Sequence, residues 1–241
     1  MENKLDEHAR AYQGEIQYDF DNDILLNWYP QRILDQVKGA GSLLELGLGH
    51  GFTTTIFSKH FSRHVVLDGS GAVIANFKAR YPGCAADIVE TYFEEFKSED
   101  RFDLVVMGFI LEHVDDPVRI LSHFKKFLAP GGRMFISVPN AEVLNRRLGH
   151  IAGLLPDMQE LSENDHVLGH QRYYTVQTLT EDVNAAGYSI VKMEGIYLKP
   201  FTTSQILSLN FDKKIINALC EVGINYPELC CGILAEIKVT S

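Results

Sequence analysis

The segment LLELGLGHGF, residues 43–52, places glycines at positions 47, 49 and 51 directly after a short apolar run. This pattern is typical of a buried strand that turns sharply into a helix. Ligands bind at such a junction in open α/β sheets, because glycine lets the backbone approach a ligand that a Cβ atom would keep away. Three alternating glycines exceed what one turn needs, which favours a ligand-binding loop over a purely structural turn.

The rest of the chain alternates between strand and helix patterns. The predicted strands cover residues 42–46, 64–67, 85–89, 102–107 and 133–138, followed by two last strands at 188–196 and 231–239. Segments with helical spacing separate them, as expected when helices connect parallel strands. The sequence therefore predicts the α/β class, with a doubly wound, mostly parallel, seven-stranded Rossmann-like sheet and helices on both faces.

Capping and breaking residues place several helices. Asp116 and Pro117 predict a helix start, and Pro130-Gly131-Gly132 predicts its end. A further helix is expected over 175–187, with Thr175 or Thr178 as its N-cap. Residues 140–170 are expected to form a helix and a polar loop, and 197–229 a mostly helical insertion between the last two strands.

Composition and charge narrow the possible partners. The formal net charge of −10 over 241 residues disfavours a nucleic-acid partner. No run approaches the roughly 18 continuous apolar residues of a membrane span, and the first residues are polar, so a cytoplasmic protein without a membrane partner is expected. No metal site is predicted: Asp115 and Asp116 resemble a helix cap, and the cysteines lack paired spacing. The four cysteines are Cys84, Cys220, Cys230 and Cys231.

The glycine spacing discriminates between possible cofactors. The dinucleotide fingerprint is G-x-G-x-x-G, whereas this chain has G-x-G-x-G and Phe52 in place of the third glycine. Glu45 precedes the first glycine, and Asp68 ends the second predicted strand. Asp68 is suited to accept hydrogen bonds from both hydroxyls of a ribose, and neither carboxylate suits a phosphate. NAD is therefore disfavoured.

Four segments carry a family resemblance: LLELGLGHG, VVLDGS, FDLVVMGFILEHVDDP and LAPGGRMFISVPN. Their order and spacing resemble those of class I S-adenosylmethionine-dependent methyltransferases, most closely the small-molecule branch that includes the ubiquinone-biosynthesis O-methyltransferases. The resemblance covers about residues 40–140. It implies S-adenosylmethionine as cofactor and methyl transfer to an O or N atom of a small-molecule acceptor.

The length of 241 residues and the composition are compatible with one large α/β domain, and we expect a single methyltransferase domain over residues 1–241. Residues 1–40 are expected to form an N-terminal helical lid, 41–140 the cofactor-binding half, and 141–241 a substrate-side half with insertions. Two alternatives remain open, namely an NAD-dependent oxidoreductase and a noncatalytic cofactor-binding protein. The sequence does not predict the oligomeric state.

Cofactor-binding residues are carried over from the family's motifs. The first segment would line the methionine and ribose parts of the cofactor, the end of the second strand would hold the ribose, and residues after the third would flank the adenine. The end of the fourth strand, with Phe109 beside it, would face the sulfonium and the acceptor. The resulting set is Glu45, Gly47, Gly49, Gly51, Asp68, Gly69, Thr91, Tyr92, Phe93, Met107 and Gly108.

Three histidines are candidate catalytic residues. A hydroxyl acceptor needs a base, whereas a neutral amine does not, so the sequence leaves the acceptor open. His170 ranks first, because GHQRYY places it among an arginine and two tyrosines; His166 follows. His113 is expected near the site in a mainly positional role. A solvated loop is the alternative for the segment that holds His166 and His170.

Overall fold

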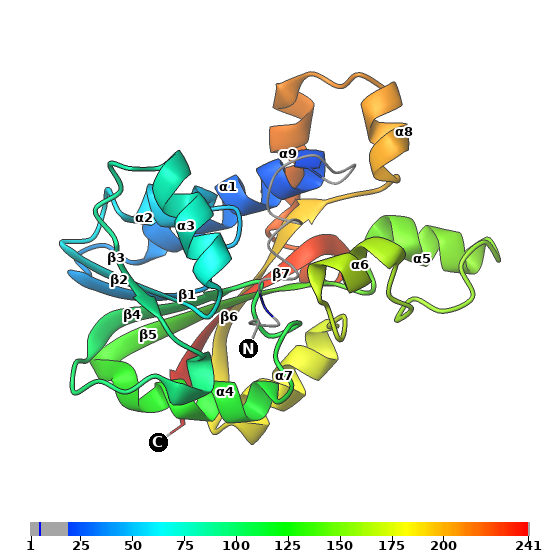
Figure 1. Cartoon of the computed structure of the whole chain (residues 1–241). Coiled ribbons are helices and arrows are strands. Elements are labelled where there is room, and N and C mark those ends of the chain that lie inside the picture. Colours follow the sequence, from blue (N-terminus) through cyan, green and yellow to red (C-terminus); the bar gives the residue numbers. More distant parts are fainter. Residues whose placement is uncertain (1–4, 6–18, 241) are drawn as a thin grey trace.

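One seven-stranded sheet, in the order β3-β2-β1-β4-β5-β7-β6, forms the centre of the molecule (Figure 1). The computed structural model describes residue 5 and residues 19–240. The strands are β1 Ser42–Leu46, β2 Arg63–Asp68, β3 Asp87–Glu90, β4 Phe102–Gly108, β5 Leu128–Pro139, β6 Tyr188–Leu198 and β7 Cys230–Val239. The first five pair in parallel, and β7 runs antiparallel to both β5 and β6. The predicted mostly parallel sheet is thus confirmed, with β7 reversed.

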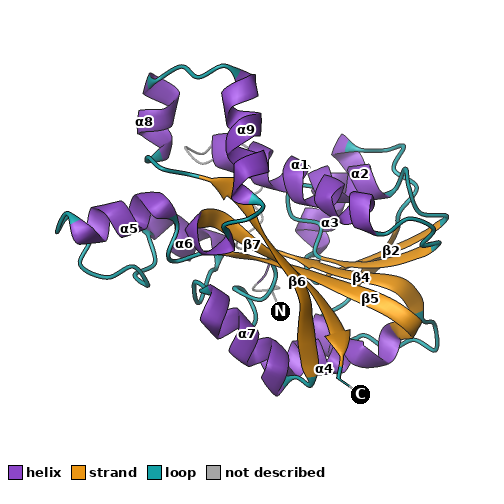
Figure 2. Ribbon diagram, turned by 180° about the vertical axis from the view of Figure 1, so that it is seen from behind, coloured by secondary structure: helices purple, strands orange, loops and turns teal. Residues whose placement is uncertain are grey.

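Helices cover both faces of the sheet, as predicted. Helices α1, α2 and α3 lie on one face and α4 and α7 on the other, while α5, α6, α8 and α9 lie beyond one end of the strands (Figures 1 and 2). Their bounds are α1 Asp19–Gln36, α2 Phe52–Phe57, α3 Gly71–Arg80, α4 Pro117–Phe124, α5 Leu144–Ile151, α6 Glu163–Leu168, α7 Val176–Ala185, α8 Thr203–Ser208 and α9 Lys213–Gly223.

The alternating side chains of β1 divide the core between the two faces. Leu44 and Leu46 pack in the cluster that contains α4 and α7, and Leu43 packs with Tyr29 and Ile33 of α1. Successive strand residues point to opposite faces, so a continuous apolar run fills both layers. The sheet is therefore buried on both sides, and its strand ends remain for polar functions.

The predicted start of α4 is confirmed, and its predicted end is wrong. The Asp116 carboxylate accepts a hydrogen bond from the Arg119 amide at 2.9 Å, which caps the helix. The helix ends at Phe124, and Pro130-Gly131-Gly132 lies within β5. There the pairing with β4 shifts register, and a Cβ on Gly132 would lie 3.0 Å from the Phe102 carbonyl oxygen. These residues therefore form a strand irregularity rather than a helix stop.

Of the two predicted N-cap candidates of α7, Thr175 is the N-cap, and Thr178 is part of the same cap. The Thr175 hydroxyl accepts from the Thr178 amide at 3.1 Å, and the Thr178 hydroxyl accepts from the Thr175 amide at 2.9 Å. This reciprocal pair is a capping box, which satisfies two amides at the helix start. Both threonines therefore contribute to the cap.

Two expectations concern the ends and the surface of the molecule. Most of the predicted N-terminal lid, residues 1–4 and 6–18, lies outside the described residues. Helix α1 follows it, and its buried Tyr29 and Ile33 belong to the core. Within residues 5 and 19–240, no helix combines the length and apolar character needed to cross a membrane.

A buried ion pair fastens α1 to the segment between β6 and α8. The Lys199 ammonium lies 2.6 Å from Asp21 Oδ2 and 2.8 Å from the Thr203 hydroxyl. All three residues are less than 10% exposed. The ammonium and the hydroxyl together compensate the buried carboxylate, which would otherwise be strongly destabilising.

We expect Lys199→Met to lower the free energy of unfolding by about 3–5 kcal/mol, because it leaves the Asp21 charge buried without its partner. The double variant Asp21→Asn/Lys199→Met should recover a large part of that loss. Denaturant unfolding of the three proteins measures both effects. Asp100→Asn, which removes one partner of the exposed Arg63 pair, is the control and should barely move the midpoint. A neutral Lys199→Met would contradict the assigned role.

Candidate functional site

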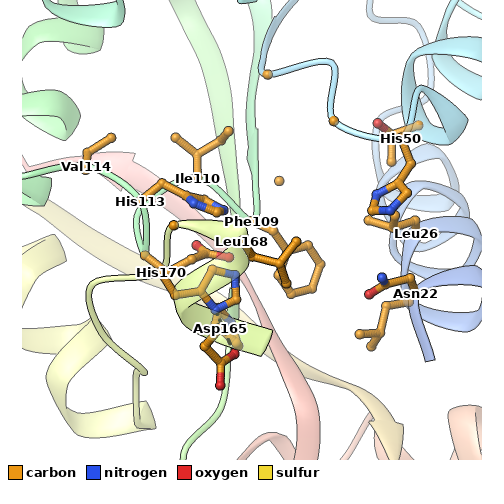
Figure 3. Close-up of a pocket in the computed structure, with 18 of the residues that line it drawn as sticks. Asn22, Leu26, His50, Phe109, Ile110, His113, Val114, Asp165, Leu168 and His170 are labelled. Carbon is orange, nitrogen blue, oxygen red and sulfur yellow. Dashed lines mark hydrogen bonds and ion pairs between the residues drawn. The ribbon is translucent and has the colours of Figure 1, made fainter. Parts of the chain in front are cut away.

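A cavity of about 920 Å³ opens at the carboxyl ends of the parallel strands. It is lined by α1, the glycine-rich loop after β1, the ends of β2 and β4, the segment after β3, and residues around α6. Figure 3 shows Asn22, Leu26 and His50 on one side of it and His113, Asp165 and His170 on the other. The strand order reverses between β1 and β4, which is where open α/β sheets bind ligands.

The glycine-rich loop lines this cavity, and the fold itself requires two of its glycines. Gly47 and Gly51 have φ of 82° and 80°, a region that L side chains rarely adopt. A Cβ at Gly47 would lie 2.6 Å from Ile110 Cδ1, and one at Gly51 would lie 2.7 Å from the Phe77 ring. Gly49, with φ of 46°, also lines the cavity. The turn and its packing thus account for part of the glycine pattern.

Asp68 lies at the end of β2 and holds two loops in place. Its Oδ2 accepts a hydrogen bond from the Leu48 amide at 2.9 Å, and its Oδ1 accepts from the Ser70 amide at 2.8 Å. Each carboxylate oxygen can accept a second hydrogen bond. Asp68 also lines the cavity, so these two hydrogen bonds orient a carboxylate at the cavity wall.

The segment after β3 completes this side of the cavity. Thr91, Tyr92 and Phe93 all line it, and the Thr91 amide donates to the Asp68 carbonyl at 2.9 Å. A Cβ on Gly69 would lie 2.6 Å from Leu5 Cδ1 and 3.4 Å from the Tyr92 ring. The structure therefore brings these predicted residues together around one end of the cavity.

Two predicted cofactor residues do not line the cavity. The Glu45 carboxylate is buried and binds the Thr53 hydroxyl at 2.7 Å and His64 Nε2 at 2.9 Å. Met107 is fully buried in the core layer of α4, because strand alternation turns its side chain to that layer. Glu45 therefore acts on the site through the start of α2, and Met107 through packing.

Gly108 and Phe109 form the strand end that reaches the cavity. A Cβ on Gly108 would overlap the hydroxyl of Tyr29, which comes from α1 across the end of β4. Phe109 has φ of 57°, and its ring meets the Tyr29 ring edge-on at 5.7 Å between centroids. Burial, together with the charge of Glu45, raises the pKa of Tyr29, which therefore stays neutral. A glycine is needed here because α1 packs so closely.

His170 is held by a buried aspartate. Its Nδ1 lies 3.0 Å from Asp165 Oδ1, while Ser162 and the Tyr173 hydroxyl donate to Asp165 Oδ2. Burial opposes ionisation of Asp165, but the hydrogen bonds from His170, Ser162 and Tyr173 hold its pKa well below the usual range. An ionised Asp165 places the hydrogen of neutral His170 on Nδ1 and leaves Nε2 as a proton acceptor.

The other two candidate histidines differ in position. His113 lines the cavity, and its ring centroid lies 4.8 Å from that of His170. His166 is exposed on α6 and is not among the residues that line the cavity, so the structure does not bring it together with His113 and His170. On a helix, His166 and the buried Asp165 point in different directions, which the sequence spacing alone did not resolve.

Sequence reasoning missed Glu112, the most unusual group in the cavity. Its side chain is fully buried, lines the cavity, and has no hydrogen-bond partner on either carboxylate oxygen within the described part of the chain. Burial raises its pKa to about 7, and the charge of His170, the proximity of the residue's own backbone amide and the charge of Arg172 oppose this rise. Glu112 lies four residues after β4 and directly before His113, and that position at a strand end was the available signal.

Glu112, His113 and His170 form one cluster. One ligand atom from each of these residues lies within 4.8 Å of the others. Two imidazoles and a buried carboxyl at this separation can share a proton or hold a small cation between them. Across the cavity, burial lowers the pKa of His50, whose ring stacks on Phe52 with a centroid separation of 6.1 Å.

Comparison with known proteins shows the family to which the chain belongs. The profile of a family described as a methyltransferase domain matches residues 21–193. The chain belongs to this methyltransferase family. The matched region includes the glycine-rich loop, Asp68, Glu112 and His170, so both sides of the cavity lie within the domain.

Relatives and solved structures agree with the family. This methyltransferase is 27% identical over 197 residues to a ubiquinone biosynthesis O-methyltransferase of Aeromonas salmonicida, covering 79% of this chain and 80% of the relative. It is 27% identical over 168 residues to a probable S-adenosylmethionine-dependent methyltransferase of Mycolicibacterium smegmatis. That match covers 69% of this chain and 59% of the relative.

A similar fold occurs in the N-methyltransferase NodS of Bradyrhizobium japonicum, solved with S-adenosylhomocysteine. The TM-score is 0.63 at 14% identity, and the match covers 100% of both chains. A second similar fold is that of the magnesium protoporphyrin IX methyltransferase of Synechocystis, also solved with S-adenosylhomocysteine. The TM-score is 0.63 at 13% identity, and the match covers 98% of this chain and 94% of the Synechocystis chain. The predicted class I S-adenosylmethionine-dependent methyltransferase is confirmed.

We expect the stability of the methyltransferase to depend on pH through Glu112. Its folded pKa of about 7 lies above the ordinary value of 4.5, so the folded state binds the proton more tightly. Protonation of Glu112 therefore contributes to the free energy of unfolding. This contribution is complete below about pH 4.5 and is lost as the pH rises through 7. Glu112→Gln should therefore become more stable relative to the wild type across this range, by on the order of 2–3 kcal/mol.

Unfolding free energies of both proteins at pH 4.5, 6 and 8 measure this difference. His170, Asp165 and Arg172 also face Glu112, and His170 is coupled to it, so the same comparison is repeated in a His170→Ala background. A difference that does not change with pH would show that the Glu112 carboxyl is solvated in the folded state.

Proposed function

We propose that this methyltransferase transfers a methyl group from S-adenosylmethionine to an O or N atom of a small-molecule acceptor. One observation carries the proposal: a single cavity joins the Asp68 and glycine-loop side to the Asp165–His170 and Glu112 side. A volume of about 920 Å³ is at the upper end of ordinary ligand sites and suits a cofactor with a small acceptor beside it.

The chain offers suitable groups for each part of the cofactor. Asp68 is the ribose ligand in this proposal, because its oriented oxygens can accept from a vicinal diol. Thr91, Tyr92 and Phe93 surround the adenine, and Gly49 allows the backbone to approach the methionine portion. When bound, S-adenosylmethionine supplies a methyl group already activated on a sulfonium, so the protein need only position the acceptor and exclude water.

His170 is the base in this proposal. Asp165 fixes its tautomer, and Nε2 remains to take a proton from the acceptor. The imidazolium formed in that step is stabilised by Asp165, which is ionised at neutral pH. His113, with its ring beside His170, has a positioning role.

Leu5 and helix α1 contribute to the cavity wall. Leu5 lies against Gly69, and Asn22, Leu26 and Tyr29 of α1 line the opposite wall. A concave cavity of this size suits a small metabolite better than a polymer, and the net charge of −10 disfavours nucleic acid. The name of the ubiquinone biosynthesis O-methyltransferase supports an oxygen acceptor, and that of the N-methyltransferase NodS is compatible with a nitrogen acceptor.

We expect Asp68→Ala to weaken binding of S-adenosylhomocysteine by about 10- to 150-fold, the equivalent of about 1.5–3 kcal/mol for hydrogen bonds to a charged group. Titration calorimetry measures the dissociation constant. Glu90→Gln is the matched control, because Glu90 ends the neighbouring strand β3 but does not line the cavity. An unchanged affinity in folded Asp68→Ala would reject the ribose assignment, and wild-type protein that binds no S-adenosylhomocysteine would reject the proposed function.

For an acceptor that the enzyme methylates, His170→Ala should lower kcat by roughly 100-fold or more while S-adenosylhomocysteine affinity stays the same. The base is then lost and the cofactor side is untouched. His166→Ala serves as the control, because this exposed histidine lies on α6, four residues before His170, and does not line the cavity. Equal kcat values in the two variants would remove His170 from the mechanism.

A further inference from the structure

The charges that line the cavity are unbalanced. Six carboxyl side chains line it, against two side chains that are always cationic. The carboxyl groups belong to Asp21, Asp68, Glu94, Glu112, Asp115 and Asp165, and the cations are Arg146 and Lys199. A cavity with this lining favours a positively charged ligand and opposes an anionic one.

Both cations are already engaged by the protein. Lys199 is paired with Asp21 and also binds the Thr203 hydroxyl. The Arg146 guanidinium donates to the carbonyl oxygens of residues 158 and 160 and lies over the Tyr173 ring at 4.8 Å. An acceptor that carries a carboxylate or phosphate would therefore find neither cation available without displacing a partner.

Glu112 differs from the other carboxyl groups of the cavity. Asp68 accepts two backbone amides, Asp165 accepts from three residues, and Asp21 is paired with Lys199. Glu94 and Asp115 are exposed, so water can solvate them. Glu112 alone among these six is fully buried and has no donor on either oxygen within the described residues. A buried carboxyl without donors is unfavourable, and a ligand that supplies them relieves this cost.

Possible methyl acceptors differ in how many hydrogen-bond donors they bring to Glu112 and His170. A hydroxyl carries one hydrogen, and if His170 removes it, both oxygens of Glu112 stay without a donor. An ammonium carries three, so one can go to His170 Nε2 while the others reach the Glu112 carboxylate. The two groups lie close enough for this, since ligand atoms of Glu112 and His170 lie within 4.8 Å of each other.

We propose that the methyl acceptor is an amine, which binds as an ammonium against Glu112 and is methylated on nitrogen. This inference rests on the proposed function and names its acceptor class. Glu112 is the specificity-determining residue, and His170 is the base that acts on the same nitrogen. The positive charge of the ammonium also compensates the ionised carboxylate in the buried site.

The proton and electron balance is complete with these groups. His170 Nε2 takes one proton from the ammonium, and the freed lone pair on nitrogen forms the bond to the methyl carbon. The carbon–sulfur bond breaks with its electron pair on sulfur, giving the neutral thioether of S-adenosylhomocysteine. The product is the protonated N-methylamine, which still pairs with Glu112, and His170 releases its proton to water.

The test uses the full chain, methyl-tritiated S-adenosylmethionine and acceptors matched in shape. One set is phenethylamine, 2-phenylethanol and phenylacetate, and a second is butylamine, butanol and butyrate. We expect label transfer to amines and not to the alcohols or acids. In Glu112→Gln, kcat/KM for the amine should fall at least 30-fold, while S-adenosylhomocysteine affinity stays within twofold of the wild type.

Glu90→Gln is the matched control. It also replaces a carboxylate by an amide, but Glu90 is exposed at the end of β3 and does not line the cavity. Its kcat/KM should stay within a factor of about three of the wild type, because exposed charges contribute little. Thermal unfolding confirms that each variant is folded before its activity is compared.

The outcomes separate the two proposals. Transfer to an alcohol or acid in preference to the amine, with or without added Mg²⁺, overturns the amine proposal, as does equal amine activity in Glu112→Gln. Absence of transfer to every amine by a protein that binds S-adenosylhomocysteine also overturns it and leaves the proposed function standing. Failure to bind S-adenosylhomocysteine removes the proposed function itself.

Discussion

The carboxylate of Asp68 is the contact on which the arrangement of the cavity depends. It sits at the end of β2 and accepts the amides of Leu48 and Ser70, so it joins the glycine-rich loop to the start of α3. Its own carbonyl accepts the Thr91 amide, which adds the segment after β3. Three loops that leave three neighbouring strands are thus fixed relative to one another, and the cavity has a rigid edge before any ligand binds.

Two buried acids, Asp165 and Glu112, lie on the opposite side of the cavity and differ in their hydrogen bonds. Asp165 receives hydrogen bonds from Ser162, Tyr173 and His170, and its pKa is lowered. Glu112 receives none from the described residues, and burial raises its pKa. The first acid orients a histidine, and the second is a residue of the cavity wall whose two buried oxygens have no partner within the described residues. Stability is sacrificed at Glu112, which is typical of groups whose partner is a ligand.

The local parts of the fold could be predicted from the sequence. The strand at 42–46 and the Asp116 cap depend on neighbouring residues, and the structure has both. Pro130-Gly131-Gly132 was misassigned because such residues break a helix and also permit an irregular strand, and only pairing with β4 decides between them. The reversal of β7 likewise depends on contacts between distant segments, which no local pattern encodes.

Residues of the cavity could be predicted from the sequence where their place at a strand end decides it. They were harder to predict where the direction of the side chain decides it. Asp68 and Thr91 follow strands that end at one edge of the sheet, so they line the cavity. Met107 lies one residue from the cavity and points to the core, and His166 lies next to the buried Asp165 and is exposed. Glu112 could not be predicted, because its unusual property is a buried carboxylate without a hydrogen-bond donor among the described residues. That property depends on the positions of all surrounding residues, which a sequence pattern does not give.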